Sequence, residues 1–322
     1  MKLALEFQRQ TVGRNDAKSV STMFALGELY RFEGKYAQAE TLLRNVLQVR
    51  SDGLGQEHLL TFFTMGGAGF RVRKPRQYGE SETLQKKGLE RRRRLLGAGH
   101  PDTLTALNNL GALYLYEGKY AAAEPLLVQS LEGRRRVLGR QHPDTLITTN
   151  SVAALYRRTG KYSQAESLYT ALLEIYARVL GAEHPERIRT VNNLAVLYRD
   201  EGKYSQAEPL AAEALERWRH TLGEEHPDTL TAMNNLARVY TEQGKYVPAE
   251  TLSRQAYSIF EETTSDVWRR YESQSLLGAT LAGQRKYSEA EPLLHSGYQG
   301  MRQREASIPA ANRSITSGRC TI

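Results

Sequence analysis

The chain has 322 residues, of which 40% are hydrophobic and 25% are charged, which is enough apolar material for a folded protein with a polar surface. It contains no run of about 18 apolar residues that would predict a membrane span, and its single cysteine, Cys320, excludes an intrachain disulfide and fits a cytoplasmic location. The net charge of +8 favours acidic partners, either an acidic peptide or nucleic acid.

A period of 42 residues organises the sequence from residue 17 to residue 303. A tyrosine and a histidine each recur with this period and so form two ladders of residues along the sequence, and Gly-Lys precedes most of the tyrosines. Two interleaved ladders of this length predict a solenoid of about seven helix hairpins. The tyrosines are Tyr36, Tyr78, Tyr120, Tyr162, Tyr204, Tyr246 and Tyr287, and the histidines are His58, His100, His142, His184 and His226.

The first elements along the chain depart from the regular pattern. Residues 1–16 align with the end of a repeat, so we expect them to form a partial second helix of a truncated repeat and a linker. The second repeat, residues 59–98, has Met65-Gly66-Gly67-Ala68-Gly69 where later repeats have Asn-Asn-Leu-Ala. Three glycines within five residues cost roughly 2–3 kcal/mol of helix propensity, so this repeat is predicted to be degenerate.

From about residue 100 to residue 250, each period predicts two helices. Between residues 103 and 114 the apolar side chains follow the spacing of one helix face, and Gly118 is expected to end that helix in the left-handed conformation. A second helix follows from about Ala121 to Val137. The sequence His-Pro-Asp-Thr, intact at three of the ladder histidines, is typical of a helix start because proline suits the first helical position. Beyond these repeats, the polar tail of residues 304–322 is expected to be disordered.

Several motifs in these repeats carry a family resemblance. They are Asn-Asn-Leu-Ala at residues 192–195 and 234–237, Gly-Lys-Tyr, Ala-Glu-Pro-Leu, and Leu-Gly-x-x-His-Pro-Asp-Thr-Leu. Over roughly residues 17–303 the sequence resembles the 42-residue tetratricopeptide repeats of kinesin light chains. The resemblance implies an all-α, right-handed superhelical solenoid of antiparallel helix hairpins. In that fold the first helix of each hairpin lines the concave face and the second lines the convex face.

The sequence predicts neither an enzyme nor a cofactor site. It has no Gly-rich phosphate loop and no His-Glu-x-x-His motif, and no matching base lies near Cys320 in the sequence. The ladder histidines do not predict a metal site, because stacked hairpins lie roughly 10 Å apart whereas a metal–nitrogen bond is about 2 Å long. The motifs therefore favour a binding protein.

The first helices carry a candidate peptide-binding site. Counting back eleven residues from the turn tyrosines gives Asn109, Ser151, Asn193 and Asn235. In the resembled family, an asparagine at this position hydrogen-bonds the backbone of an extended peptide, which suits a side chain with both a donor and an acceptor. The alternative is that this asparagine bonds a neighbouring helix and holds the stack together.

Four arginines lie about one helical turn from these positions. They are Arg157, Arg189, Arg199 and Arg238. A guanidinium group pairs with a carboxylate through two parallel hydrogen bonds, so we expect the concave face to bind an extended, acidic segment of a protein partner. The alternative for these arginines is an ordinary solvated surface.

Two other functions stay open. Because residue 1 does not start a repeat, the repeats could be a structural or sensory arm of a larger protein with a kinase or nucleotide-binding effector domain. Nucleic acid could instead bind the runs Arg91–Arg94 and Arg134–Arg136 at the ends of second helices. These runs also complement the helix dipole and lack interleaved stacking aromatics, so nucleic-acid binding is not expected.

Overall fold

The computed structural model describes residues 16–32, 36–54, 76–263, 267–305 and 308. All regular elements among these residues are helices, which confirms the all-α prediction. The chain divides into two compact units, residues 1–110 and 111–322. Apart from residue 16, the predicted partial helix at the start lies outside the described residues, as does most of the first helix of the degenerate second repeat.

In the first unit, the helices α2 (Ala17–Phe32) and α3 (Tyr36–Leu54) pack together as a hairpin. Their shared core is built from Val20, Met23, Leu26, Tyr30, Ala39 and Val46. The helix α5 (Arg76–Leu96) follows, and α6 (Pro101–Tyr116) begins in this unit and ends in the second.

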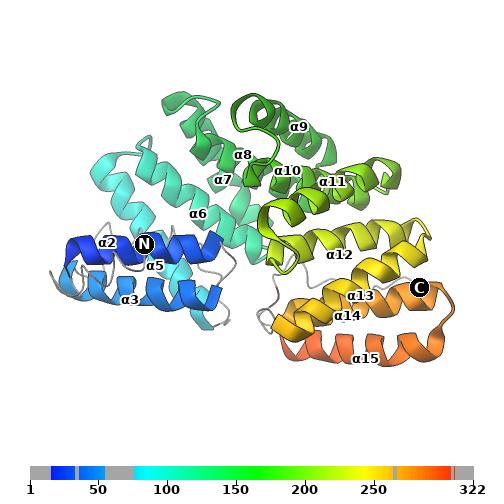
Figure 1. Ribbon diagram of the computed structural model, residues 1–322. Coiled ribbons are helices and arrows are strands. Elements are labelled where there is room, and N and C mark those ends of the chain that lie inside the picture. The colour runs from blue at the N-terminus through cyan, green and yellow to red at the C-terminus, as the bar shows by residue number, and fades with distance from the viewer. Residues whose placement is uncertain (1–15, 33–35, 55–75, 264–266, 306–307, 309–322) are drawn as a thin grey trace. The chain divides into compact units, whose positions relative to one another are not determined.

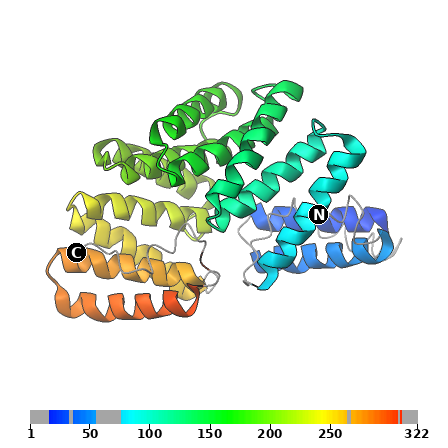
Figure 2. The same cartoon turned by 180° about the vertical axis from the view of Figure 1, so that it is seen from behind.

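The second unit is a row of helices in which each one packs against the next (Figures 1 and 2). The first helices of its hairpins are α8, α10, α12 and α14, and the second helices are α7, α9, α11, α13 and α15. Their bounds are α7 (Tyr120–Val137), α8 (Pro143–Arg158), α9 (Tyr162–Val179), α10 (Pro185–Asp200), α11 (Tyr204–Leu222), α12 (Pro227–Glu242), α13 (Tyr246–Thr263), α14 (Val267–Gly283) and α15 (Tyr287–Gln303). This arrangement is that of an all-α helical repeat solenoid. None of the described helices combines the length and the apolar character needed to cross a bilayer.

The His-Pro motif starts the helices α6, α8, α10 and α12, as predicted, and the structure assigns a task to the histidine. Its Nδ1 atom accepts a hydrogen bond from the backbone N–H two residues further on, at 3.1 Å for His226 and 3.2 Å for His100, His142 and His184. The first N–H groups of a helix have no partner within the helix, so a side-chain acceptor at this position stabilises its start. The four ladder histidines that the structure describes are therefore helix caps.

Glycine ends the first helices α6, α8, α10 and α12, again as predicted. The φ angles of Gly118, Gly160, Gly202 and Gly244 lie between 74° and 76°, in the left-handed region that glycine enters without strain. In the last hairpin Arg285 takes this conformation with a φ of 62°. The same turn therefore recurs even where the glycine does not.

In each of the last four hairpins, the lysine before the turn tyrosine ties its hairpin to the preceding one; it follows a glycine in three of them and Arg285 in the fourth. Its ammonium group pairs with a glutamate of the preceding second helix and also lies over a tyrosine ring of its own hairpin in three of the four repeats. Each pair is partly exposed and contributes on the order of 0.5 kcal/mol, so the repetition matters more than any single pair. The ion pairs are Lys161–Glu124 (2.5 Å), Lys203–Glu166 (3.7 Å), Lys245–Glu208 (2.6 Å) and Lys286–Glu250 (3.0 Å).

Candidate functional site

The predicted binding residues all lie on first helices, but not in one unit. Asn109 lies on α6 in the first unit, and the other seven lie in the second unit. Those seven are Ser151 and Arg157 on α8, Arg189, Asn193 and Arg199 on α10, and Asn235 and Arg238 on α12.

The asparagines link successive first helices. Asn193 Nδ2 donates to Asn150 Oδ1 at 3.1 Å, and Asn235 Nδ2 donates to Asn192 Oδ1 at 3.0 Å. Ser151, at the equivalent position of α8, donates to the carbonyl of Ile147 within its own helix, at 3.2 Å. The stacking role considered for these asparagines is therefore present in the structure. It uses one N–H of each amide and does not decide whether the remaining polar atoms bind a peptide.

Three of the predicted arginines and one further arginine gather near the C-terminal ends of α8, α10 and α12. We call Arg157, Arg158, Arg199 and Arg238 the arginine cluster. Arg157 Nη1 donates to Asp200 Oδ2, and Arg199 Nη2 donates to Asp200 Oδ1 at 2.7 Å. One carboxylate thus joins guanidinium groups from two successive first helices.

The third predicted arginine of the cluster has a carboxylate of its own. Arg238 Nη2 donates to Glu272 Oε1 at 2.9 Å, across to α14. The glutamate side chain is only 12% exposed, so this pair is better shielded from solvent than an ordinary surface pair. Arg157, Arg199 and Arg238 thus share two bonded carboxylates, those of Asp200 and Glu272.

Burial and mutual repulsion shape the electrostatics of the arginine cluster. Burial, and then the neighbouring charge of Arg157, lowers the pKa of Arg158 to about 10. Burial also lowers the pKa of Arg199; the carboxylate of Asp200 opposes this shift, and the charges of Arg238 and Arg157 add to it. Burial acts to raise the pKa of Asp200, but the Arg199 and Arg157 guanidinium groups outweigh it and hold that pKa below its usual range. An additional negative charge here would relieve repulsion among the arginines.

The fourth predicted arginine, Arg189, lies apart from the cluster. It is ten residues before Arg199 on the same helix, which places the two about 15 Å apart along the helix axis. Arg189 pairs with Glu186 at 2.5 Å and with Asp228 at 3.9 Å, near the starts of α10 and α12. The predicted peptide-binding site includes both arginines. In the structure they lie near opposite ends of α10.

The sequence did not single out Arg158, Asp200 or Glu272. A signal for the first two exists, because the last residues of four successive first helices are Tyr116, Arg158, Asp200 and Glu242. This position changes its charge from repeat to repeat, whereas the tyrosine two residues before it and the glycine two residues after it recur in all four repeats. A position that varies against a constant repeat frame is a candidate for partner recognition.

The runs of arginine on the second helices are not simply surface charges. Arg92 is 8% exposed and Arg134 is 3% exposed. Arg134 Nη1 donates to the carbonyl of Asp144 and to Thr148 Oγ1, both at 2.7 Å. Besides lying where they complement the helix dipole, Arg92 and Arg134 are therefore buried, which the sequence did not indicate.

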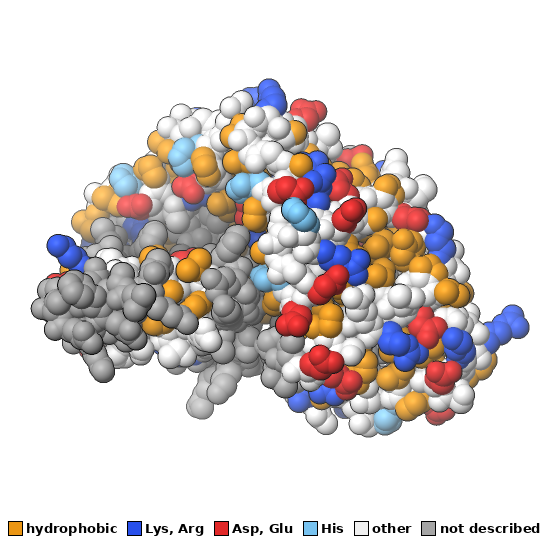
Figure 3. All heavy atoms as spheres, viewed as in Figure 1, with side chains coloured by type: hydrophobic (Ala, Val, Ile, Leu, Met, Phe, Trp, Pro, Cys, Tyr) orange, Lys and Arg blue, Asp and Glu red, His pale blue; other side chains and the backbone are white. Residues whose placement is uncertain are grey.

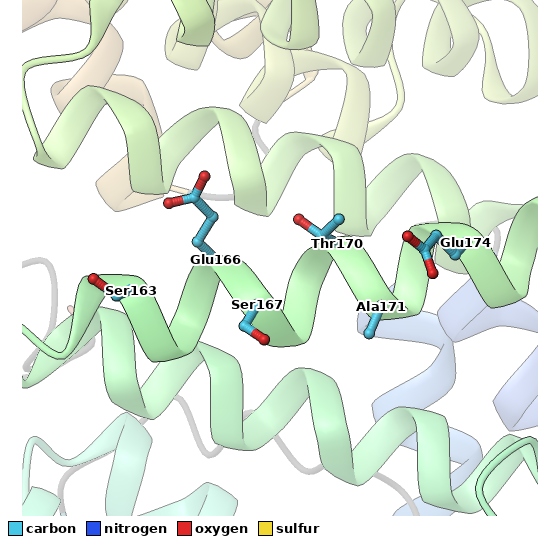
Figure 4. A pocket seen from close by; sticks show the side chains of 6 residues that line it. All are labelled: Ser163, Glu166, Ser167, Thr170, Ala171 and Glu174. Carbon is cyan, nitrogen blue, oxygen red and sulfur yellow. The ribbon is translucent and has the colours of Figure 1, made fainter.

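The surface of the second unit offers no continuous basic stripe in the view of Figure 3, where acidic and basic side chains are interspersed. A hollow of about 460 Å³ lies along α9, and its described lining residues all belong to that helix (Figure 4). Its lining includes none of the predicted site residues and consists of Ser163, Glu166, Ser167, Thr170, Ala171 and Glu174. Within the described part of the chain, no group of three or more His, Cys, Asp and Glu side chains is placed to hold a metal ion.

Known proteins place the chain in a family. Profiles of the tetratricopeptide repeat match residues 22–57, 73–102, 103–144, 144–216 and 186–262, which together span most of the sequence. The chain belongs to the tetratricopeptide repeat family. The repeats are of the kinesin light chain-like type with a 42-residue period, as the sequence motifs indicated.

Solved structures of other tetratricopeptide repeat proteins resemble this one, while no curated protein matches its sequence. A putative kinesin light chain of Podosopora anserina with nearly identical TPR-like repeats is 27% identical, with a TM-score of 0.54 over 64% of this chain and 98% of that one. BtubC (BKLC) from P. vanneervenii is 24% identical, with a TM-score of 0.58 over 71% and 92%. A Rap protein complexed with Competence and Sporulation Factor is 15% identical, with a TM-score of 0.67 over 90% and 78%. The last two, below 25% identity, show the fold alone.

Proposed function

We propose that the second unit is a protein-interaction scaffold that binds an extended, acidic segment of a partner across its first helices. The observation that supports this proposal is the arginine cluster, in which guanidinium groups from three successive first helices outnumber the carboxylates bonded to them. A carboxylate of the partner would gain charge-assisted hydrogen bonds and relieve the repulsion within the cluster. No catalytic group is needed for this function.

The asparagines would supply the contact that does not depend on the partner's sequence. Asn193 and Asn235 are half-buried, and their bonds to Asn150 and Asn192 fix the orientation of each amide. A fixed amide with an unused acceptor and a second N–H suits the backbone of an extended peptide. The stacking role and the peptide role are therefore compatible in one side chain.

The tetratricopeptide fold supports a binding role in general. These repeats generally mediate protein–protein interactions, and the Rap protein with a similar fold was solved in complex with Competence and Sporulation Factor. As part of the same proposal we place the protein in the cytoplasm, because a chain with one cysteine makes no use of an oxidising compartment.

The direct test is binding of labelled extended peptides, acidic and matched neutral, followed by fluorescence anisotropy. We expect micromolar affinity for acidic peptides and at least a tenfold loss on Arg238→Gln or Asn193→Ala. Arg254→Gln is the matched control, since Arg254 is an exposed arginine on the second helix α13. Thermal unfolding of each variant separates lost binding from lost folding.

Two outcomes would argue against the proposal. If Arg238→Gln and Asn193→Ala leave the affinity of every bound peptide unchanged, the first helices are not the binding surface. If a DNA or RNA oligonucleotide binds more tightly than any peptide, and its affinity falls by about a thousandfold between 50 and 200 mM salt, the arginines serve nucleic acid instead.

A further inference from the structure

The second helices α7, α9, α11 and α13 each turn one face towards the following first helix, and α13 shows that face in detail. The Tyr246 ring lies against Gly283, so closely that an added Cβ there would be 2.2 Å from the ring. Glu250 accepts hydrogen bonds from Gln284 at 2.7 Å and from Lys286 at 3.0 Å. Tyr257, two turns further along α13, lies under the Arg270 guanidinium at 6.0 Å. This face is the contact through which one repeat continues into the next.

The helix α15 carries the same face with nothing described against it. Its residues in the same register are Tyr287, Glu291 and Tyr298, since the repeats here are 41 residues apart. Tyr287 is 63% exposed and Tyr298 is 41% exposed, whereas Tyr246 and Tyr257 are half-buried. Figures 1 and 2 both show α15 at the edge of the second unit, with α14 beside it.

The exposed residues of this face form a single stripe along α15. Tyr287, Glu291, His295, Tyr298 and Arg302 follow one another at intervals of four, four, three and four residues, and all five are exposed. These intervals keep the side chains on one side of a helix. The stripe combines two tyrosine rings, one imidazole, one carboxylate and one guanidinium group.

The order of these residues makes the stripe complementary to itself. Glu291 and Arg302 lie equally far from the point between Ser296 and Gly297, and so do His295 and Tyr298. If a second α15 lay antiparallel to the first about a two-fold axis at that point, each Glu291 would face an Arg302 and each His295 would face a Tyr298. A two-fold interface requires this reciprocal pairing.

We propose that the stripe of Tyr287, Glu291, His295, Tyr298 and Arg302 is a homodimer interface, in which α15 packs antiparallel against α15 of a second copy. It continues the mode of packing that α13 already uses within the chain, where a tyrosine and a glutamate in the same register contact the end of α14 and the turn that follows it. One helix pair buries less area than a standard interface, so the dimer is weak, with a dissociation constant on the order of 10 µM. This interface is separate from the arginine cluster, so it stands independently of the proposed peptide binding.

Sedimentation velocity on the full chain, from about 1 to 200 µM, tests the interface. The buffer contains a reductant so that Cys320 cannot crosslink two copies. Glu291→Arg and Arg302→Glu each place like charges opposite one another, and each is expected to weaken dimerisation at least tenfold. The double variant Glu291→Arg/Arg302→Glu restores the opposite charges and is expected to return to within about threefold of the unaltered protein.

The control is Glu289→Arg, which makes the same change of charge two residues away. Glu289 is exposed and points about 160° away from the side of the helix that carries the stripe, so dimerisation should be unchanged. A protein that stays monomeric at every concentration overturns the proposal and leaves the face to another partner or to residues 309–322. Equal weakening by Glu289→Arg, or no recovery in the double variant, overturns it as well.

Discussion

Asp200 is the residue on which the proposed recognition site depends most. Its carboxylate accepts hydrogen bonds from Arg157 of the preceding first helix and from its neighbour Arg199, and its side chain is 26% exposed. These are the guanidinium groups that a carboxylate of an acidic partner would seek. Asp200 therefore competes with the partner while it keeps the two arginines in place.

Replacing the competing charge should strengthen binding. We expect Asp200→Asn to raise the affinity for acidic peptides about three- to tenfold, equivalent to roughly 1 kcal/mol, because the amide leaves the arginines less neutralised. The slope of affinity against salt should also steepen. Fluorescence anisotropy at two salt concentrations measures both effects. Asp144→Asn, which alters an exposed aspartate at the start of α8, serves as the control.

An unchanged or lower affinity would contradict this account of Asp200. It would mean that the carboxylate matters for holding the arginines and not for competing with a ligand. Chemical unfolding of the same variant is then informative, because a purely positioning role predicts a loss of stability together with the loss of affinity.

At the scale of single residues, the sequence could predict the positions of the asparagines and arginines but not their partners. The 42-residue register located Asn193 and Arg199 correctly on a first helix. It could not show that Asn193 would donate to Asn150, because that bond spans 43 residues and depends on side-chain direction across two helices. Arg189 lies one turn before Asn193 on α10, as predicted, and whether it contacts the same peptide as Arg199 stays a prediction.

At the scale of helices, the sequence was more informative because helix starts and ends are local. The His-Pro and Gly-Lys motifs fixed the bounds of α6, α8, α10 and α12 through capping interactions that involve neighbouring residues only. The burial of Arg134 was missed, although a comparison in register would have indicated it. The same position holds Tyr176, Trp218 and Phe260 in the later repeats, all of them buried. A position that is aromatic in three repeats is a core position in the others.

Glu250 makes the contact between α13 and the last hairpin sensitive to pH. Hydrogen bonds from Arg254 and Gln284, followed by the bond and charge of Lys286, lower the pKa of Glu250 to about 2. A carboxylate whose pKa is lower in the folded state stabilises the fold above its unfolded pKa, near 4.5, and loses that contribution as the pH falls through the folded pKa. The contact is therefore at full strength at neutral pH.

The variant Glu250→Gln should reveal this contribution. At pH 7 we expect it to lower the free energy of unfolding by about 1–2 kcal/mol relative to the unaltered protein. The difference should shrink as the pH falls from about 4.5 towards 2, because the unaltered glutamate then becomes neutral too. Urea unfolding at a series of pH values measures the difference. A gap that stays constant down to pH 3 would show that the carboxylate charge is not the source.

At the scale of the whole molecule, stability is distributed along the repeats. Each helix of the second unit packs mainly against the helices before and after it, so its free energy is close to a sum over neighbours. Among the described helices, α14 and α15 make the most extensive contact with each other. A Cβ added at Gly300 would lie 2.1 Å from the Tyr271 ring. The Arg304 guanidinium lies 4.7 Å from the centre of that ring. The ring also packs against the cluster of Trp268, Met301 and Ile308.

Ile308 is unexpectedly buried at this end of the chain. It lies within the tail for which disorder is predicted, yet it is 1% exposed. Most of the tail, residues 309–322, lies outside the described residues, so the prediction of disorder there stays a prediction. The apolar contact of Ile308 with Trp268 and Met301 anchors the last hairpin and restricts how far Tyr271 can move.

The variant Gly300→Ala should therefore damage one hairpin and spare the rest. Because Tyr271 cannot give way freely, we expect a loss of about 1–3 kcal/mol in the local stability of α14 and α15. Hydrogen exchange should then show at least fivefold faster exchange in these two helices and less than twofold change in α8 and α9. Gly53→Ala in α3 is the control, since an added Cβ there meets nothing within 4 Å. Uniformly faster exchange in all helices of the second unit would instead mean that it unfolds as one cooperative body, and that the additive description of its repeats is wrong.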